Sequence, residues 1–121
     1  MPWTYHQSTR HLEHNGEFVG YGYSGHGPGK NNPAMQSVPN FGPIPRGTYR
    51  IGAPFTHPHA GHYAMRLTPV NGTNTFGRDG FMIHGDSMTR PGDASNGCLI
   101  EGPAIRQRIW NSNDHILEVI Q

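Results

Sequence analysis

Residues 81–86 read Phe-Met-Ile-His-Gly-Asp, and residues 94–100 read Ala-Ser-Asn-Gly-Cys-Leu-Ile. Each segment holds an apolar run of strand length, bounded by glycine or small polar residues, which is typical of a short buried strand. The first run ends at His84, and the second begins at Cys98. If the two strands are neighbours, the loop between them is long enough to bring an imidazole and a thiol together.

Similar short runs occur along the whole chain, separated by glycines and prolines. There are 17 Gly and 11 Pro among 121 residues, roughly twice the usual share of about 12%. The pattern predicts strands at residues 3–6, 17–23, 47–51, 62–70, 80–84, 97–101 and 115–120. Asn15-Gly16 predicts a hairpin turn between the first two of these runs, because both residues tolerate positive φ. We therefore expect a mainly β fold, a small sandwich or barrel.

One short helix is expected after Cys98. Pro103 follows Gly102, and proline is favoured at the first helical position. Ile105 and Ile109 then lie on one face, and residues 111–114 end the helix. Three long loops remain, at 24–41, 53–61 and 86–95, and long ordered loops in small domains are usually functional or mobile.

Composition excludes several classes of protein. The length of 121 residues predicts a single domain that spans residues 1–121. No apolar run approaches about 18 residues, so no membrane span is expected. The formal charge of +1 is too near neutral to predict nucleic acid as a partner. The N-terminus also lacks the basic and apolar segments of a signal peptide.

Cys98 is the one cysteine, so no internal disulfide is expected. Fourteen positions separate it from His84. Beside an imidazolium, a thiol ionises below its usual pKa of about 8.5 and becomes a nucleophile. Backbone N–H groups of Gly97 and Cys98 could then stabilise an oxyanion. The alternative is a buried small side chain near a hydrogen-bonded histidine, and spacing alone does not separate the two.

The motif resembles a known family. His-Gly at 84–85, a polar loop and Ser-x-Gly-Cys at 95–98 resemble the signature of L,D-transpeptidases, cysteine enzymes that remodel peptidoglycan. The segment 42–51, Gly-Pro-Ile-Pro-Arg-Gly-Thr-Tyr-Arg-Ile, is similar to their Pro-x-Gly-x-aromatic-x-Ile stretch. Segments 3–5, 7–9, 22–25 and 30–33 resemble the short branch delivered as type VI secretion effectors.

The resemblance implies roles for individual residues. Cys98 matches the family nucleophile, and His84 matches its general base. A third group in the family orients the histidine, often through a backbone carbonyl. Gly85 or Asp86 matches that position, and the sequence does not decide between them.

The turn before the cysteine agrees with the family in part. Gly97 matches the oxyanion turn, and Ser95 matches the serine that shapes it. Asn96 stands where many relatives carry a second histidine, which leaves His84 as the one base in the motif. Ile100 stands where many relatives carry arginine. Recognition of a substrate carboxylate is therefore assigned to another arginine, with the candidates Arg46, Arg78 and Arg90.

The implied reaction acts on tetrapeptide stems of peptidoglycan and needs no cofactor. The thiol would expel the terminal D-alanine and form a thioester, which water, a free D-amino acid or a second stem then resolves. The products are a trimmed tripeptide, an exchanged stem or a 3–3 cross-link. The effector branch further implies an antibacterial toxin acting in the periplasm of target bacteria, with the type VI secretion machinery and a cognate immunity protein as partners.

Two other functions compete with this one. His57-Pro58-His59, His62 and the His84-x-Asp86 pair would suit a zinc-dependent cell-wall peptidase, although no His-Glu-x-x-His pattern occurs. A non-catalytic wall-binding module would instead stack sugars on aromatic side chains, here Trp3, Tyr5, Tyr21, Tyr23 and Trp110. Such aromatics are more often part of the core.

Overall fold

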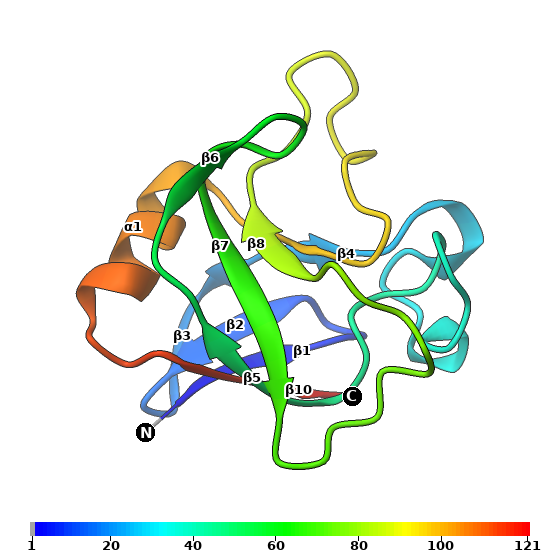
Figure 1. The fold of residues 1–121 in the computed structure, drawn as a ribbon, viewed down its shortest axis with the longest axis horizontal. Helices are drawn as coiled ribbons and strands as arrows, with labels where there is room; N and C mark the ends of the chain where they lie inside the picture. Colours follow the sequence, from blue (N-terminus) through cyan, green and yellow to red (C-terminus); the bar gives the residue numbers. More distant parts are fainter. Residues whose placement is uncertain (1) are drawn as a thin grey trace.

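A computed structural model describes residues 2–121 and contains ten strands, nine of them along one sheet path (Figure 1). The strands are β1 (Trp3–His6), β2 (His11–His14), β3 (Glu17–Tyr21), β4 (Tyr23–Ser24), β5 (Gly47–Ile51), β6 (Phe55–His57), β7 (Gly61–Val70), β8 (Met82–His84), β9 (Leu99–Ile100) and β10 (Ile116–Ile120). Their spatial order is β3-β2-β1-β10-β5-β7-β8-β9-β4, and β6 pairs with β7. The fold is therefore mainly β, as the sequence predicts.

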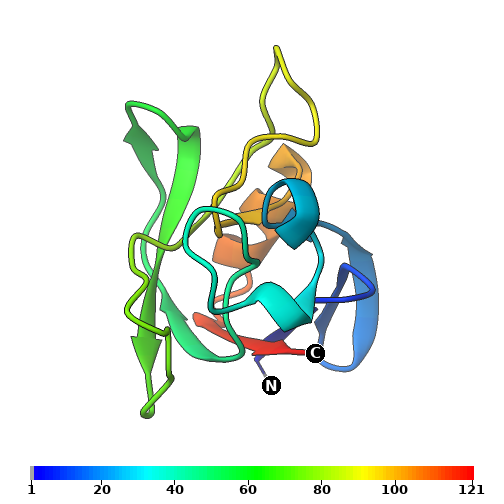
Figure 2. The same cartoon turned by 90° about the vertical axis from the view of Figure 1, so that its right-hand side faces the viewer.

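The two ends of the sheet path are consecutive in the sequence. β3 and β4 lie at opposite edges, yet only Gly22 separates them along the chain. The sheet must therefore curl around the core until its edges nearly meet, although no ladder of hydrogen bonds closes it. Figure 2 shows the result: the β6–β7 hairpin, in green, lies on the opposite side of the molecule from the β2–β3 hairpin, in blue.

The core lies inside this curl. Trp3, Leu117 and Tyr49 lie opposite one another on three adjacent strands, and each is fully buried. The alternation of buried and partly exposed residues along β1 follows the two-residue period of a strand. Burial of one such large side chain contributes roughly 1.5–3 kcal/mol. This row of contacts fixes the register of the central strands.

Two predicted strands differ from the structure. Asn15 and Gly16 do form a turn with positive φ values of 54° and 79°. The strand before that turn is β2, however, and not residues 3–6, which pair with β2 and β10. β2 escaped prediction because Leu12 is its one buried apolar residue. The run 17–23 is also divided at Gly22, where the chain crosses from one edge of the sheet to the other.

The connections include one α-helix, α1 (Pro103–Asn111), which begins at the predicted proline and buries Ile109. The loop 24–41 contains two short 3₁₀ turns, η1 (Gly27–Gly29) and η2 (Pro33–Met35). The loop expected at 53–61 contains β6, which the sequence pattern missed. Within residues 2–121, no helix has the length and apolar character needed to cross a membrane.

Candidate active site

The parallel pair β8 and β9 positions the candidate thiol and imidazole. Ile83 lies opposite Leu99, and His84 lies opposite Ile100. Ile83 and Leu99 point into the core and are fully buried. His84 is the last residue of β8, and Cys98 directly precedes β9. The two sequence segments that suggested the site are thus adjacent in space.

Cys98 is half-buried and directly precedes β9. Its Sγ lies 3.7 Å from the carbonyl oxygen of Gly80, to which the thiol donates. Burial raises the pKa of the thiol above its ordinary value, and the Met82 N–H and the Arg78 charge offset this in part. The thiol is therefore protonated at rest, in contrast to the lowered pKa that pairing with an imidazolium predicts.

His84 is 6% exposed. Its Nδ1–H donates to the carbonyl oxygen of Gly85 at 2.8 Å, which leaves the lone pair on Nε2. Burial lowers the pKa of the imidazole, the bond to Gly85 raises it, and the nearby Arg106 charge lowers it further. A neutral imidazole in this tautomer can accept a proton through Nε2. The resting pair is then a neutral thiol and a neutral base.

The turn that leads into Cys98 is held by two serines. Ser95 Oγ accepts the N–H groups of Gly25 at 2.9 Å and Gly97 at 3.1 Å, and it donates to the Cys98 carbonyl at 2.7 Å. Ser24 Oγ donates to the same carbonyl at 2.9 Å. Gly97 has a φ of 132°, a conformation that favours glycine. Its N–H donates to Ser95 Oγ inside the turn, whereas the motif predicts that it faces an oxyanion site.

Arg78 clasps the backbone around this turn. Its guanidinium donates to the carbonyls of Pro43 at 2.8 Å, Gly42 at 2.9 Å and Asn96 at 3.4 Å, and also to that of Gln36. The arginine is 8% exposed. These four carbonyls occupy both terminal nitrogens, so the role of Arg78 in the structure is to join residues 36–43 to the segment before Cys98.

None of the three arginines proposed for carboxylate binding is among the described residues that line the cleft beside His84. Arg78 is occupied as above. Arg46 is exposed, and Arg90 is 79% exposed and 3.9 Å from Asp93. Recognition of a carboxylate inside that cleft therefore needs a different cation.

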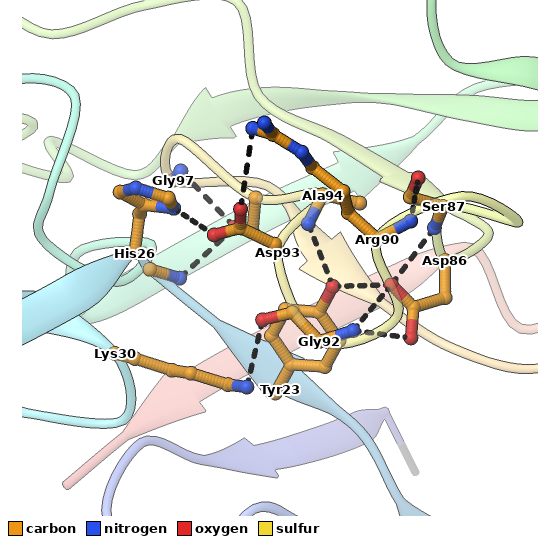
Figure 3. Close-up of polar contacts among 12 residues, drawn as sticks. Tyr23, His26, Lys30, Asp86, Ser87, Arg90, Gly92, Asp93, Ala94 and Gly97 are labelled. Carbon is orange, nitrogen blue, oxygen red and sulfur yellow. Dashed lines mark hydrogen bonds and ion pairs between the residues drawn. The ribbon is translucent and has the colours of Figure 1, made fainter.

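Asp86, the alternative partner for His84, makes other contacts. Its carboxylate accepts from the Tyr23 hydroxyl at 2.6 Å, the Ser87 N–H at 2.8 Å and the Gly92 N–H at 2.9 Å (Figure 3). Burial raises the pKa of the carboxyl, but these three hydrogen bonds outweigh it and hold the pKa below the ordinary value. Asp86 thereby closes the loop 86–92, while the Gly85 carbonyl contacts the imidazole.

The same loop is tied to the 3₁₀ segment on its other side. Lys30 Nζ donates to the Gly92 carbonyl at 2.7 Å, and His26 Nδ1 lies 2.6 Å from the Asp93 carboxylate (Figure 3). We call these contacts, together with the Tyr23–Asp86 bond, the loop latch. It fixes the connection between the strand that carries His84 and the strand that carries Cys98.

An open cleft of about 990 Å³ lies beside His84 and Gly85. The β6–β7 turn, the loop 85–91 and the start of α1 form its walls. Two of its lining side chains, Glu101 and Arg106, are buried with polar atoms that have no hydrogen-bond partner among the described residues. Burial raises the pKa of Glu101 to about 8. No motif or spacing in the sequence marks either residue as functional.

The histidines proposed for zinc do not gather. Within residues 2–121, no group of three or more His, Cys, Asp or Glu side chains is placed to hold a metal ion. His57 Nδ1 instead accepts the N–H groups of His59 and Ala60 at 3.0 Å. His62 Nδ1 lies 3.2 Å from the Thr56 hydroxyl.

Most of the aromatics proposed for sugar stacking belong to the interior. Trp3 and Tyr5 are fully buried, and Tyr23 is 8% exposed. Trp110 packs partly buried against the core. Tyr21 is the exception, at 55% exposed. A wall-binding face built from all five residues is therefore not available.

Cysteine-dependent acyl transfer uses a thiol with an imidazole base, and here His84 ends β8 while Cys98 directly precedes the neighbouring parallel strand β9. Residues 19–120 match the Tlde1 domain. Because this match covers most of the chain, the protein belongs to the Tlde1 domain family, whose members are type VI secretion effectors of the L,D-transpeptidase type. The match confirms the resemblance to the effector branch. No curated protein matches the chain.

Proposed function

We propose that the protein is a peptidoglycan-modifying cysteine enzyme that acts on tetrapeptide stems as an L,D-transpeptidase and L,D-carboxypeptidase. The observation that carries the proposal is the parallel pairing of β8, which ends at His84, with β9, which directly follows Cys98, within a chain of the Tlde1 family. The bond from His84 Nδ1 to Gly85 supports the base role, because it leaves Nε2 able to accept a proton.

The first half-reaction forms a thioester. His84 Nε2 takes the thiol proton as Cys98 Sγ attacks the carbonyl carbon of the third residue of the stem. The C–N bond to D-alanine then breaks, and His84 returns its proton to the leaving amine. Because the resting thiol is protonated, proton removal and attack occur together and no preformed thiolate is required.

The second half-reaction resolves the thioester. His84 removes a proton from water, from the amine of a free D-amino acid or from the amine of a second stem. The acceptor forms the new bond to the acyl carbon, the C–S bond breaks, and the proton returns to Sγ. Trimming and exchange would deplete the tetrapeptide donors of a growing wall, which would make the protein toxic in the periplasm and would require an immunity protein in the producing cell.

Mass analysis of purified tetrapeptide muropeptides tests this function. We expect the wild type to remove the terminal D-alanine, or to exchange it for an added D-amino acid, and we expect Cys98→Ala and His84→Ala to do neither. The same assay with an added chelator distinguishes the zinc-dependent alternative, since a thiol enzyme keeps its activity and a zinc enzyme loses it. Unchanged muropeptides with folded wild type, or product formation by the Cys98→Ala protein, would reject the proposal.

A further inference from the structure

Arg106 is a buried cation without a partner. Its side chain is 8% exposed, and burial lowers its pKa. Among residues 2–121, the guanidinium makes no hydrogen bond or ion pair, and its Nε is fully buried without an acceptor. A buried polar group left unpaired costs about 1–3 kcal/mol, and a charged one costs more. Such a group indicates a ligand of opposite charge.

A comparison with Arg78 shows that the lack of hydrogen-bond acceptors around Arg106 is unusual for a buried arginine of this protein. Both arginines are 8% exposed. Arg78 donates to four backbone carbonyls, whereas Arg106 donates to none in the described part of the chain. Glu101 lines the same cleft but forms no ion pair with Arg106 within residues 2–121. The fold thus provides hydrogen-bond acceptors for the guanidinium of Arg78 and none for that of Arg106.

The position of Arg106 relates it to the candidate base. The guanidinium occupies the space where a side chain at Gly85 would lie, directly after His84. It is close enough to lower the pKa of His84. Arg106, His84 and Gly85 all line the cleft, whereas Cys98 does not. The cleft therefore lies on the His84 side of the thiol, and of the two arginines that line it, Arg10 and Arg106, only Arg106 lies against Gly85.

The chemistry of the proposed reaction says what belongs on that side. The base that protonates the leaving nitrogen must lie next to it. In a C-terminal amino acid, only the α-carbon separates that nitrogen from the carboxylate. A planar guanidinium binds a carboxylate through two parallel hydrogen bonds. Extending from the thiol past His84, the substrate would bring its terminal carboxylate to Arg106.

We propose that Arg106 binds the C-terminal carboxylate of the D-amino acid that leaves the stem, and the carboxylate of the free D-amino acid that replaces it. The two share one subsite, because exchange is the reverse of release. This inference rests on the proposed function and names the substrate group that the cleft recognises. It replaces Arg46, Arg78 and Arg90 as the source of the carboxylate-binding cation.

The test compares a tetrapeptide ending in a free carboxylate with the same peptide ending in an amide. For the wild type we expect kcat/KM to favour the acid by about 10- to 100-fold, the effect of one charge-assisted pair. Arg106→Gln should lower kcat/KM for the acid by that factor and leave the amide nearly unchanged. Arg106→Lys should be intermediate, because lysine lacks the fork of donors. The control is Arg108→Gln, which removes an exposed arginine from the same helix and should keep the full preference.

Binding to a Cys98→Ala protein gives a readout that does not depend on turnover. Calorimetry with the acid and amide peptides should show the same preference, and Arg106→Gln in that background should abolish it. Equal affinity for the two peptides, or an undiminished preference in Arg106→Gln, would overturn the proposal even if the enzyme is active. Absent turnover with retained acid preference would instead reject the proposed function and keep the carboxylate site. Should Arg106→Gln fail to fold, Arg106→Lys carries the test, and an acid preference equal to that of the wild type would then overturn the proposal.

Discussion

The protonation states of Cys98 and His84 distinguish two kinds of cysteine chemistry. Burial raises the pKa of the thiol and lowers that of the imidazole. Both shifts favour the neutral pair over the ion pair at neutral pH, because each penalises the charged form. In its protonation state the pair is closer to the neutral serine and histidine of a serine hydrolase than to a preformed thiolate–imidazolium pair.

Alkylation by iodoacetamide tests this difference. Only the thiolate reacts, so a raised thiol pKa predicts a rate at pH 7 below that of a model thiol, rising as the pH passes 9. His84→Ala should change that rate little. Turnover should persist below pH 6.5, because the imidazole with its lowered pKa stays a base there. A fast rate that is constant from pH 5 upward would indicate an ion pair and contradict the neutral resting state.

The buried carboxyl of Glu101 makes the stability of the folded protein depend on pH. Both carboxyl oxygens are buried without a hydrogen bond in residues 2–121, and burial raises its pKa to about 8 from an ordinary 4.5. The folded protein therefore holds a proton that the unfolded chain has released. This contribution to stability is complete below pH 4.5, falls as the pH rises toward 8, and changes no further above that.

Replacing Glu101 with glutamine should remove this dependence. Between pH 4.5 and pH 9, the wild type should lose roughly 4–5 kcal/mol more unfolding free energy than Glu101→Gln, at about 1.4 kcal/mol per pKa unit. Urea denaturation at several pH values measures both curves. Parallel curves would mean that the carboxyl is ionised or well solvated in the folded protein.

At the scale of elements, the parallel pair β8–β9 and its connecting loop make the site. Parallel strands need a long crossover, and here the crossover is the loop 85–98 with no helix of its own. The loop latch replaces the missing helix by tying the crossover to Tyr23, His26 and Lys30. These partners come from the segment that follows β3, far away in sequence.

Loosening the latch should reduce activity without removing a reacting group. Asp86→Ala deletes the acceptor for Tyr23, Ser87 and Gly92, so we expect kcat/KM for the tetrapeptide to fall about tenfold through misplacement of His84 and Cys98. Limited proteolysis should also cut the loop 86–94 faster. The control is Arg90→Ala, which removes only a solvent-exposed ion pair of little energetic value. Equal activity and equal cleavage of the two variants would show that the latch is not needed.

Prediction from the sequence succeeded where short-range signals were strong. The turn at Asn15-Gly16, the helix start at Pro103 and the strands around His84 and Cys98 all follow from local patterns. The pairing of β1 with β10 and the crossing at Gly22 depend on contacts between distant segments, which no local pattern encodes. Arg106 was missed for the same reason: its burial against Gly85 exists only once α1 packs beside β8.

For the whole molecule, the proposed function predicts a dependence on compartment. A wall-directed enzyme meets its substrate only in the periplasm. Expression in the cytoplasm of a test bacterium should therefore leave growth unchanged, whereas a periplasmic version should stop growth or lyse the cells. The periplasmic Cys98→Ala protein, at the same level, should be harmless. Equal toxicity in both compartments would contradict a peptidoglycan target.

The position of β10 has a consequence for a chain that lacks its last strand. This strand lies between β1 and β5, so residues 116–120 join the N-terminal hairpins to the rest of the sheet. Without these residues β1, β2 and β3 have no strand that joins them to β5, and the cleft lacks the side that Arg10 and Tyr21 provide. Pairing between segments so distant in the chain is also slow. A chain truncated before residue 116 should therefore fail to complete the cleft, although it keeps both His84 and Cys98.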